Sequence, residues 1–220
     1  MEDPQYRRRF WAGARVGSVR MGGVQPNAGH LALAHLEAAG RIDGVITQNV
    51  DGLHRRAGSR TVVELHGSGA AFRCTACGHR TSRAEVLGAF DDLNPGFAEA
   101  HSDAEIAPDG DAIVDAGAEV IVPPCPVCGG ILRPDVVYFG ETVPTDVFAA
   151  AESLLGGAGA LLLAGTSLAV NTGVRLVHRA ERRGIPIAII NRGATSVDAR
   201  ATVRIDGGTT EVLRALAARL

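Results

Sequence analysis

The sequence is without lysine, without any long apolar run and almost without net charge. Its 22 basic residues, all of them arginine, are opposed by 24 acidic residues, which leaves a formal net charge of −2. A chain so nearly neutral creates no field that would draw it to nucleic acid or to an anionic membrane surface. We therefore expect neither a nucleic-acid-binding protein nor a membrane-bound one.

Targeting signals are also missing. No apolar run approaches the roughly 20 residues needed to span a bilayer, and the first residues lack the basic-then-apolar order of a signal peptide. We expect a cytoplasmic protein. Of the 220 residues, 46% are hydrophobic, which is enough to bury a full core in one large domain or in one domain with a small insertion.

The four cysteines form two C-x-x-C pairs, with none left over: Cys74, Cys77, Cys125 and Cys128. In a reducing compartment this pattern favours one metal ion held by four thiolates over two disulfides. Small buried core residues or a redox C-x-x-C are the alternatives. Zinc is the natural occupant, and four protein ligands leave no position open for water or substrate. We therefore expect one structural Zn²⁺ and not a catalytic one.

Apolar runs alternate with helical patterns along most of the chain. Asn27 is a suitable N-cap for a helix over 28–39, and Gly40 is a suitable stop. The other predicted helices cover 173–183 and a closing segment from about 210, and the predicted strands cover 44–49, 61–65, 160–164, 185–190 and 201–205. Such alternation predicts an α/β fold with a mostly parallel sheet that is covered on both faces.

Residues 71–134 break this pattern. The segment contains both cysteine pairs and several turn-forming stretches, and it lies between the second and third predicted strands. We interpret residues 71–134 as an inserted zinc-binding module within an α/β domain formed by residues 1–70 and 135–220.

Polar side chains follow the predicted strands. Residues 47–54 read T-Q-N-V-D-G-L-H directly after Val45 and Ile46, and His66 follows the next apolar run. Open α/β sheets hold their ligands at the ends of their strands. The sequence therefore predicts a ligand site that contains an amide, a carboxylate and an imidazole.

Several motifs occur in an order that resembles the sirtuin (Sir2) family. They are T-Q-N-V-D-G-L-H at 47–54, E-L-H-G at 64–67, the two C-x-x-C pairs, V-Y-F-G-E at 137–141, G-T-S-L at 165–168 and I-N at 190–191. The resemblance covers nearly the whole chain. The stretches around Asn27, Asn94 and 107–111 are most similar to the branch that contains a mitochondrial sirtuin and many bacterial relatives.

The resemblance implies a Rossmann-like NAD-binding domain and NAD-dependent removal of acyl groups from lysines of protein substrates. The acyl group would pass to ADP-ribose, with release of nicotinamide. Two alternatives stay open: mono-ADP-ribosyl transfer from the same pocket, and a non-catalytic zinc-bearing module that binds acyl-lysine peptides.

The same resemblance implies roles for individual residues. His66 matches the catalytic base, and an imidazole, which titrates near neutral pH, suits proton abstraction. The cofactor-binding residues would be Gln48, Asn49, Asp51, Gly165, Thr166, Ser167, Asn191, Arg192 and Gly193. The residues along which the substrate backbone would lie as an added strand are Val137, Phe139, Gly140 and Glu141.

The chain departs from the family pattern at its start. Sirtuins open with a strand followed by G-A-G-x-S and then a D-F-R or D-Y-R segment, and the sequence contains neither. We expect a sheet that lacks its first strand and the helix N-terminus that would hold the diphosphate. Either a start codon assigned too late or a truncated relative with impaired NAD binding would explain this.

Overall fold

The computed structural model describes residues 3–21, 23–107, 111–114 and 119–220. Of the family-like stretch at 107–111, residues 108–110 lie outside the described residues. The chain divides into two compact units. The cysteine unit consists of Met1–Val24 and Ser68–Val136, and the sheet unit consists of Gln25–Gly67 and Val137–Leu220.

The sheet unit contains two parallel sheets. In the first, β1 (Val45–Thr47) pairs with β2 (Val62–Glu64), and in the second the order is β6 (Leu161–Ala164), β7 (Ile187–Asn191) and β8 (Val203–Asp206). Its helices are α2 (Ala28–Ala38), α3 (Leu53–Arg56), α6 (Thr145–Gly157), α7 (Asn171–Arg182), the short 3₁₀ helix η1 (Asp198–Arg200) and α8 (Thr209–Ala217). These parallel strands confirm the Rossmann-like α/β class predicted from the sequence.

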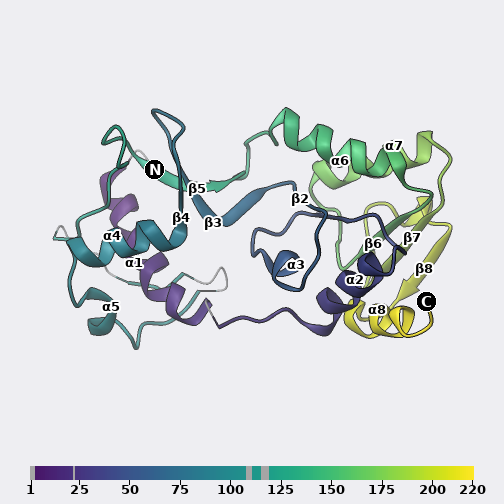
Figure 1. Ribbon diagram of the computed structural model, residues 1–220, viewed down its shortest axis with the longest axis horizontal. Helices are drawn as coiled ribbons and strands as arrows, with labels where there is room; N and C mark the ends of the chain where they lie inside the picture. Colours follow the sequence, from purple (N-terminus) through teal and green to yellow (C-terminus); the bar gives the residue numbers. More distant parts are fainter. Residues whose placement is uncertain (1–2, 22, 108–110, 115–118) are drawn as a thin grey trace. The chain divides into compact units, whose positions relative to one another are not determined.

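Helices cover both faces of the β6–β7–β8 sheet. Ile187 and Ile189 of β7 belong to a core cluster with residues of α6 and α7, whereas Ile190 packs with Ala32 of α2 and Leu213 of α8. Successive residues of a strand point to opposite faces, so one apolar run supplies both cores. Figure 1 shows α6 beside α7, and α2 beside α8.

Helix α2 begins where its cap predicts. The side chain of Asn27 accepts the backbone N–H groups of Gly29 and His30, and Nδ1 of His30 accepts the N–H of Asn27 in return. This reciprocal arrangement satisfies donors that the first turn would otherwise leave open. The last turn ends at Ala38, just before Gly40, which has a φ of +68°.

The cysteine unit is built on a small sheet with the order β4 (Arg80–Ser82), β3 (Gly67–Cys74), β5 (Leu132–Val136), and its helices are α1 (Pro4–Met21), α4 (Arg83–Leu93) and α5 (Phe97–Ala100). Trp11 of α1 is fully buried and stacks on Phe72 of β3 with ring centroids 4.7 Å apart. The stacking places α1 in this unit, whereas the sequence interpretation put residues 1–24 in the α/β domain.

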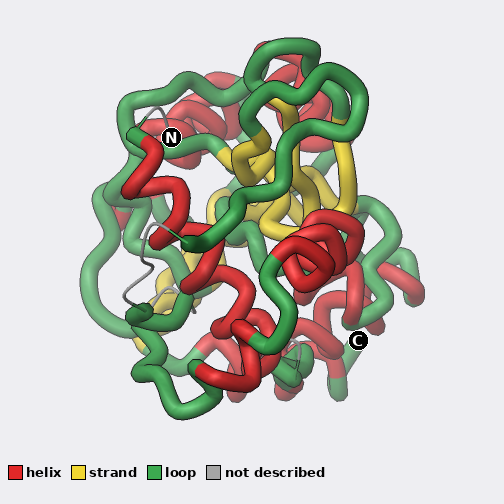
Figure 2. Tube along the Cα trace, turned by 90° about the vertical axis from the view of Figure 1, so that its left-hand side faces the viewer, coloured by secondary structure: helices red, strands yellow, loops and turns green. Residues whose placement is uncertain are grey.

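Loops and turns make up much of the chain between the helices and the short strands, as the colouring by secondary structure in Figure 2 shows. Within the part of the chain that the structure describes, every helix is too short or too polar to cross a membrane.

Candidate active site and metal centre

The T-Q-N-V-D-G-L-H segment forms a turn immediately after β1. Thr47 is buried, and its Oγ1 accepts the backbone N–H of Asn49 at 3.0 Å. Oδ1 of Asp51 accepts the N–H of Leu53 at 2.9 Å, and Gly52 has a φ of +69°. These bonds end the strand and start α3, so the side chain of Asn49 and the remaining oxygen of Asp51 lie on an exposed turn.

His66 lies at the end of the neighbouring strand, β2. The parallel register pairs Thr47 with Glu64, and the N–H of Leu65 donates to the carbonyl of Thr47 at 2.9 Å. His66 Nδ1 lies 3.1 Å from the carbonyl oxygen of Gln48. Because a carbonyl only accepts, this contact places a proton on Nδ1 and leaves Nε2 with its lone pair. The imidazole is therefore prepared to accept a proton at Nε2.

The segment Val137 to Glu141 begins beside His66. The backbone N–H of Val137 donates to the carbonyl oxygen of His66 at 2.9 Å. Beyond it a turn forms in which the N–H of Tyr138 donates to Oε2 of Glu141 at 3.0 Å, and Gly140 has a φ of +86°. Phe139 is 98% exposed at the tip of this turn.

The G-T-S-L loop follows β6. Gly165, with a φ of +63°, donates its N–H to the carbonyl of Ile190 at 2.9 Å. Oγ1 of Thr166 accepts the N–H of Leu168 at 3.2 Å, and the carbonyl of Ser167 accepts the N–H of Ser196 at 3.1 Å. Leu168 itself has a positive φ of 52° and a buried side chain. These contacts fix the loop at the carboxyl end of the sheet.

A cavity of about 410 Å³ opens at this end of the sheet. It is lined by Gly165, Asn191, Arg192, Gly207, Gly208, Thr209, Thr210 and Glu211. Asn191 is buried, and its Nδ2 donates to the carbonyl oxygens of Arg192 and Gly193, each at 3.1 Å. No side chain of the described residues caps α8 at Gly208, so the first N–H groups of that helix are available to a ligand.

The sequence analysis did not identify the lining residues that follow β8. Gly207 to Glu211 form the turn and first helical positions that close the cavity. Their sequence, G-G-T-T-E after an apolar run, carries the signal of a strand end followed by a helix start, which is where α/β sheets hold ligands.

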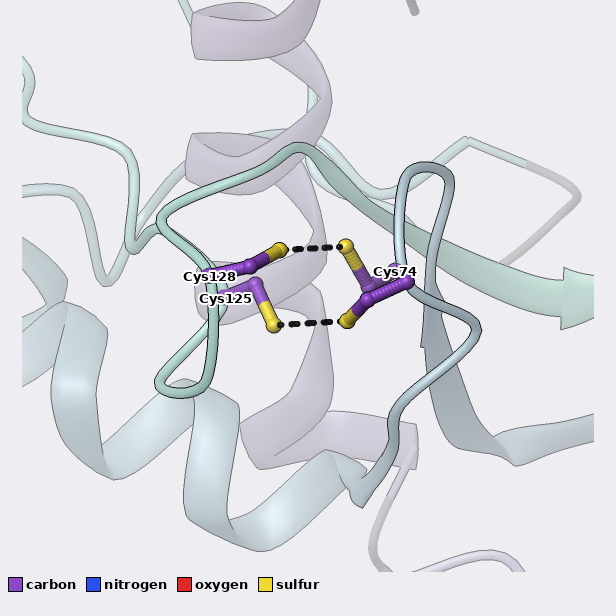
Figure 3. Close-up of side chains that lie close together, drawn as sticks. Cys74, Cys125 and Cys128 are labelled. Atoms are coloured by element: carbon purple, nitrogen blue, oxygen red, sulfur yellow. Dashed lines mark hydrogen bonds between the residues drawn. The ribbon is translucent and has the colours of Figure 1, made fainter.

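The cysteine unit brings four possible metal ligands together. The four sulfur atoms of Cys74, Cys77, Cys125 and Cys128 all lie within 4.8 Å of one another, and none of the four is in a disulfide. The sulfurs are 3.5 Å apart between Cys74 and Cys128 and 3.8 Å apart between Cys77 and Cys125, and Figure 3 shows the two pairs facing each other. Tetrahedral zinc with thiolates at about 2.3 Å requires sulfurs about 3.8 Å apart. The cysteines are therefore positioned to bind one zinc ion.

Each C-x-x-C pair is held in a tight turn that ends on glycine. Gly78 donates its N–H to the carbonyl of Cys74 at 3.1 Å, and Gly129 donates to the carbonyl of Cys125 at 2.9 Å. Both glycines have a positive φ, 74° and 72° respectively, a conformation that glycine adopts without steric cost. Cys74 and Cys125 are buried and belong to the same core cluster as Trp11.

Comparison with known proteins identifies the family. The sequence model of the Sir2 family matches residues 2–172. The chain belongs to the Sir2 family. This sirtuin is 52% identical over 221 residues to NAD-dependent protein deacetylase 1 of Mycobacterium avium, covering 99% of the chain and 78% of that relative. It is 46% identical to the NAD-dependent protein deacetylase of Xanthomonas axonopodis, covering 94% of the chain and 71% of the relative.

Solved structures give the same result. The sirtuin superposes on a Sir2 homolog in complex with NAD with a TM-score of 0.75 and 32% identity, over 99% of this chain and 72% of that one. It superposes on Sir2Tm bound to a propionylated peptide with a TM-score of 0.72 and 31% identity, over 91% of this chain and 73% of that one. Similarity at this level shows that the chain has the sirtuin fold.

Proposed function

We propose that this sirtuin is an NAD-dependent protein-lysine deacetylase. The observation that carries the proposal is the meeting of three segments at the ends of β1 and β2: the octapeptide turn, His66 and the segment that begins at Val137. A base, polar groups for an amide and an exposed backbone segment are the parts this reaction needs. The curated relatives are named for this activity.

His66 is the proposed general base. Its Nδ1 is engaged by the carbonyl of Gln48, which leaves Nε2 to take the proton of a sugar hydroxyl as that hydroxyl captures the acyl group. When bound, NAD supplies a ribose carbon that becomes electrophilic as nicotinamide leaves. The residues of the protein position that carbon and accept the proton.

The cofactor would lie along two groups of strand-end residues. Asn49 and Asp51 on the turn after β1 offer a donor and an acceptor, which is the pairing that a carboxamide such as that of nicotinamide requires. Gln48 would face the nearby ribose. The loop residues Gly165, Thr166 and Ser167 would bind phosphate and ribose, and Asn191, Arg192 and Gly193 would hold the adenosine end beside the cavity.

The substrate is proposed to be an acylated lysine in an extended peptide. Val137, Phe139, Gly140 and Glu141 would pair with its backbone as an added strand. Structural neighbours include Sir2 bound to an acetylated peptide and Sir2Tm bound to a propionylated peptide. The zinc ion, enclosed by four thiolates, is proposed to support the cysteine unit and to take no part in the chemistry.

The experiment is to incubate the purified protein with NAD and an acetyl-lysine peptide. Nicotinamide, deacetylated peptide and O-acetyl-ADP-ribose are expected in equal amounts, and each should require both reactants. Release of nicotinamide with transfer of radiolabel from NAD to protein, and no deacetylated peptide, would instead establish ADP-ribosyl transfer. Peptide binding without any NAD turnover would identify a non-catalytic module.

A further inference from the structure

Gly173 occupies a position in the first turn of α7 where an added Cβ would meet the ends of two side chains. It is buried, and a Cβ added to it would lie 2.5 Å from Cδ2 of Leu168 and 3.1 Å from Nε2 of Gln48. Real Cβ atoms do not come within 3.0 Å of another heavy atom without a shift. Any larger residue at 173 must therefore displace Leu168, Gln48 or the helix itself.

Crowding of this kind is found at some helical glycines and not at others. A Cβ added to Gly13 in α1 would lie 2.5 Å from the backbone oxygen of Ala112, whereas two other helical glycines have open space. A Cβ added to Gly88 in α4 or to Gly156 in α6 would meet nothing within 4 Å.

Glycine within a helix is less favourable than alanine. At Gly173 the side chains of Leu168 and Gln48 lie against the helix. The small size of glycine therefore leaves space for both side chains.

The two side chains beside Gly173 come from the two groups of strand-end residues described above. Nε2 of Gln48 is buried and has no hydrogen-bond partner among the described residues, and the carbonyl of the same residue contacts His66. Leu168 ends the G-T-S-L loop in a positive-φ conformation. Gly173 thus adjoins the turn after β1 and the loop after β6 at one point.

We propose that Gly173 is a positioning residue for NAD. The missing side chain at 173 leaves room for the buried Gln48 amide to lie against α7, and it lets Leu168 hold the G-T-S-L loop beside that amide. This inference rests on the proposed function, because it concerns the same cofactor site. It adds a residue that touches neither cofactor nor substrate and acts through Gln48.

The test compares Gly173→Ala with Gly156→Ala, which places the same methyl group on a helix where space is open. For Gly173→Ala, we expect the KM for NAD to rise about fivefold or more, with kcat and the KM for acetyl-peptide changed less than about twofold. Gly156→Ala should match the wild type in all three values. A general loss of structure would instead change kcat and the peptide KM as well.

A double-mutant cycle tests whether the effect passes through Gln48. In a Gln48→Ala background, Gly173→Ala should add less than about a twofold further rise in the KM for NAD. An unchanged KM in Gly173→Ala would overturn the inference, and so would a full repeat of the effect in the Gln48→Ala background.

Two provisions keep the test decisive. If Gly173→Ala does not fold, Gly173→Ala combined with Leu168→Ala relieves the 2.5 Å contact while keeping the methyl group 3.1 Å from Gln48. The same rise in KM is then expected relative to Leu168→Ala alone, and equal KM values in these two variants would overturn the inference. If the wild type shows no deacetylation, the proposed function fails by itself. The same variants are then compared by calorimetric titration with NAD, where equal affinities of Gly173→Ala and the wild type would overturn the inference.

Discussion

Nδ1 of His66 and the carbonyl oxygen of Gln48 lie 3.1 Å apart, which joins the ends of two adjacent parallel strands. The contact holds the imidazole by its Nδ1–H and defines which nitrogen can act as a base. It uses a backbone carbonyl, so no side-chain substitution at 48 removes it directly. The chemistry of His66 is therefore tied to the path of the main chain after β1.

Replacement of His66 tests its proposed role as the base. In His66→Ala, kcat for deacetylation should fall at least about 100-fold, because no other group would take the hydroxyl proton. Steady-state assays of deacetylated peptide measure the loss. His35→Ala removes an exposed imidazole from α2 and should leave kcat unchanged. A decrease of only a few fold in His66→Ala would contradict the assignment.

Removal of the metal should open the core of the cysteine unit. Cys74 and Cys125 share their core cluster with Trp11, the only tryptophan of the chain. Since the ion would join the two C-x-x-C turns, a zinc chelator should loosen this core and shift the emission of Trp11 to longer wavelength, and added zinc should reverse the shift. Elemental analysis should find about one zinc per chain and almost none in Cys125→Ser. Full zinc content in Cys125→Ser would contradict the four-cysteine centre.

Glu37 should stabilise the segment that leads into β2. This carboxylate is buried, and its oxygens accept the backbone N–H groups of Arg60 at 2.8 Å and Thr61 at 2.7 Å. Glu37→Gln replaces one acceptor oxygen by an NH₂ group, so we expect a loss of about 1–3 kcal/mol in the free energy of unfolding at neutral pH. Urea titration measures it. Glu99→Gln, on an exposed carboxylate, should change the free energy little.

The same carboxylate should make the free energy of unfolding depend on pH. Burial raises the pKa of Glu37, but the hydrogen bonds from Thr61 and Arg60 outweigh it and hold the pKa below its usual value. A lowered pKa in the folded state contributes stability that is present above the ordinary pKa of about 4.3 and is lost as the pH falls through the folded value. When the pH is lowered below about 4, the free energy of unfolding should therefore decrease less in Glu37→Gln than in the wild type.

His54 should destabilise the fold at mildly acidic pH. Its ring lies 4.7 Å from that of His30, centroid to centroid. Burial chiefly, and then the charge of His30, lower the pKa of His54 against the opposing effect of Asp51. A lowered histidine pKa means that the unfolded chain binds the proton first, so stability falls as the pH drops below about 6.5.

Melting temperatures at pH 8 and at pH 5.5 measure this effect. The decrease between the two values should be smaller in His54→Gln than in the wild type, because glutamine does not titrate. An identical decrease in both proteins would show that other groups cause it. His178→Gln, a histidine of α7, serves as the matched control and should keep the decrease of the wild type.

The helix that follows Asn27 and most strands of the sheet unit could be predicted, because local patterns determine them. The prediction of a strand over 44–49 was too long, since Thr47 Oγ1 takes the N–H of Asn49 and ends the pairing at Thr47. The four cysteines could be grouped from spacing alone. These features depend on caps, apolar runs and ligand chemistry, all of which are written in short stretches of sequence.

Features that depend on contacts between distant residues could not be predicted. Helix α1 joins the cysteine unit because Trp11 stacks on Phe72, and no local pattern indicates that pairing. Thr209 and Thr210 reach the cavity because α8 starts beside the loop at Gly165. The crowding at Gly173 is likewise invisible in sequence, where the residue reads only as a weak helix former.

The hydrogen bond between Val137 and His66 also has a consequence for the design of chimeric proteins. The chain leaves the sheet unit after Gly67 and returns to it at Val137, and that bond holds the exit and the return together at 2.9 Å. A segment whose two ends are already adjacent can be exchanged for another of different length at little entropic cost. The boundaries at Gly67 and Val137 are therefore natural junctions for chimeras that graft the cysteine segment of one relative, together with its residues 1–24, onto the sheet of another.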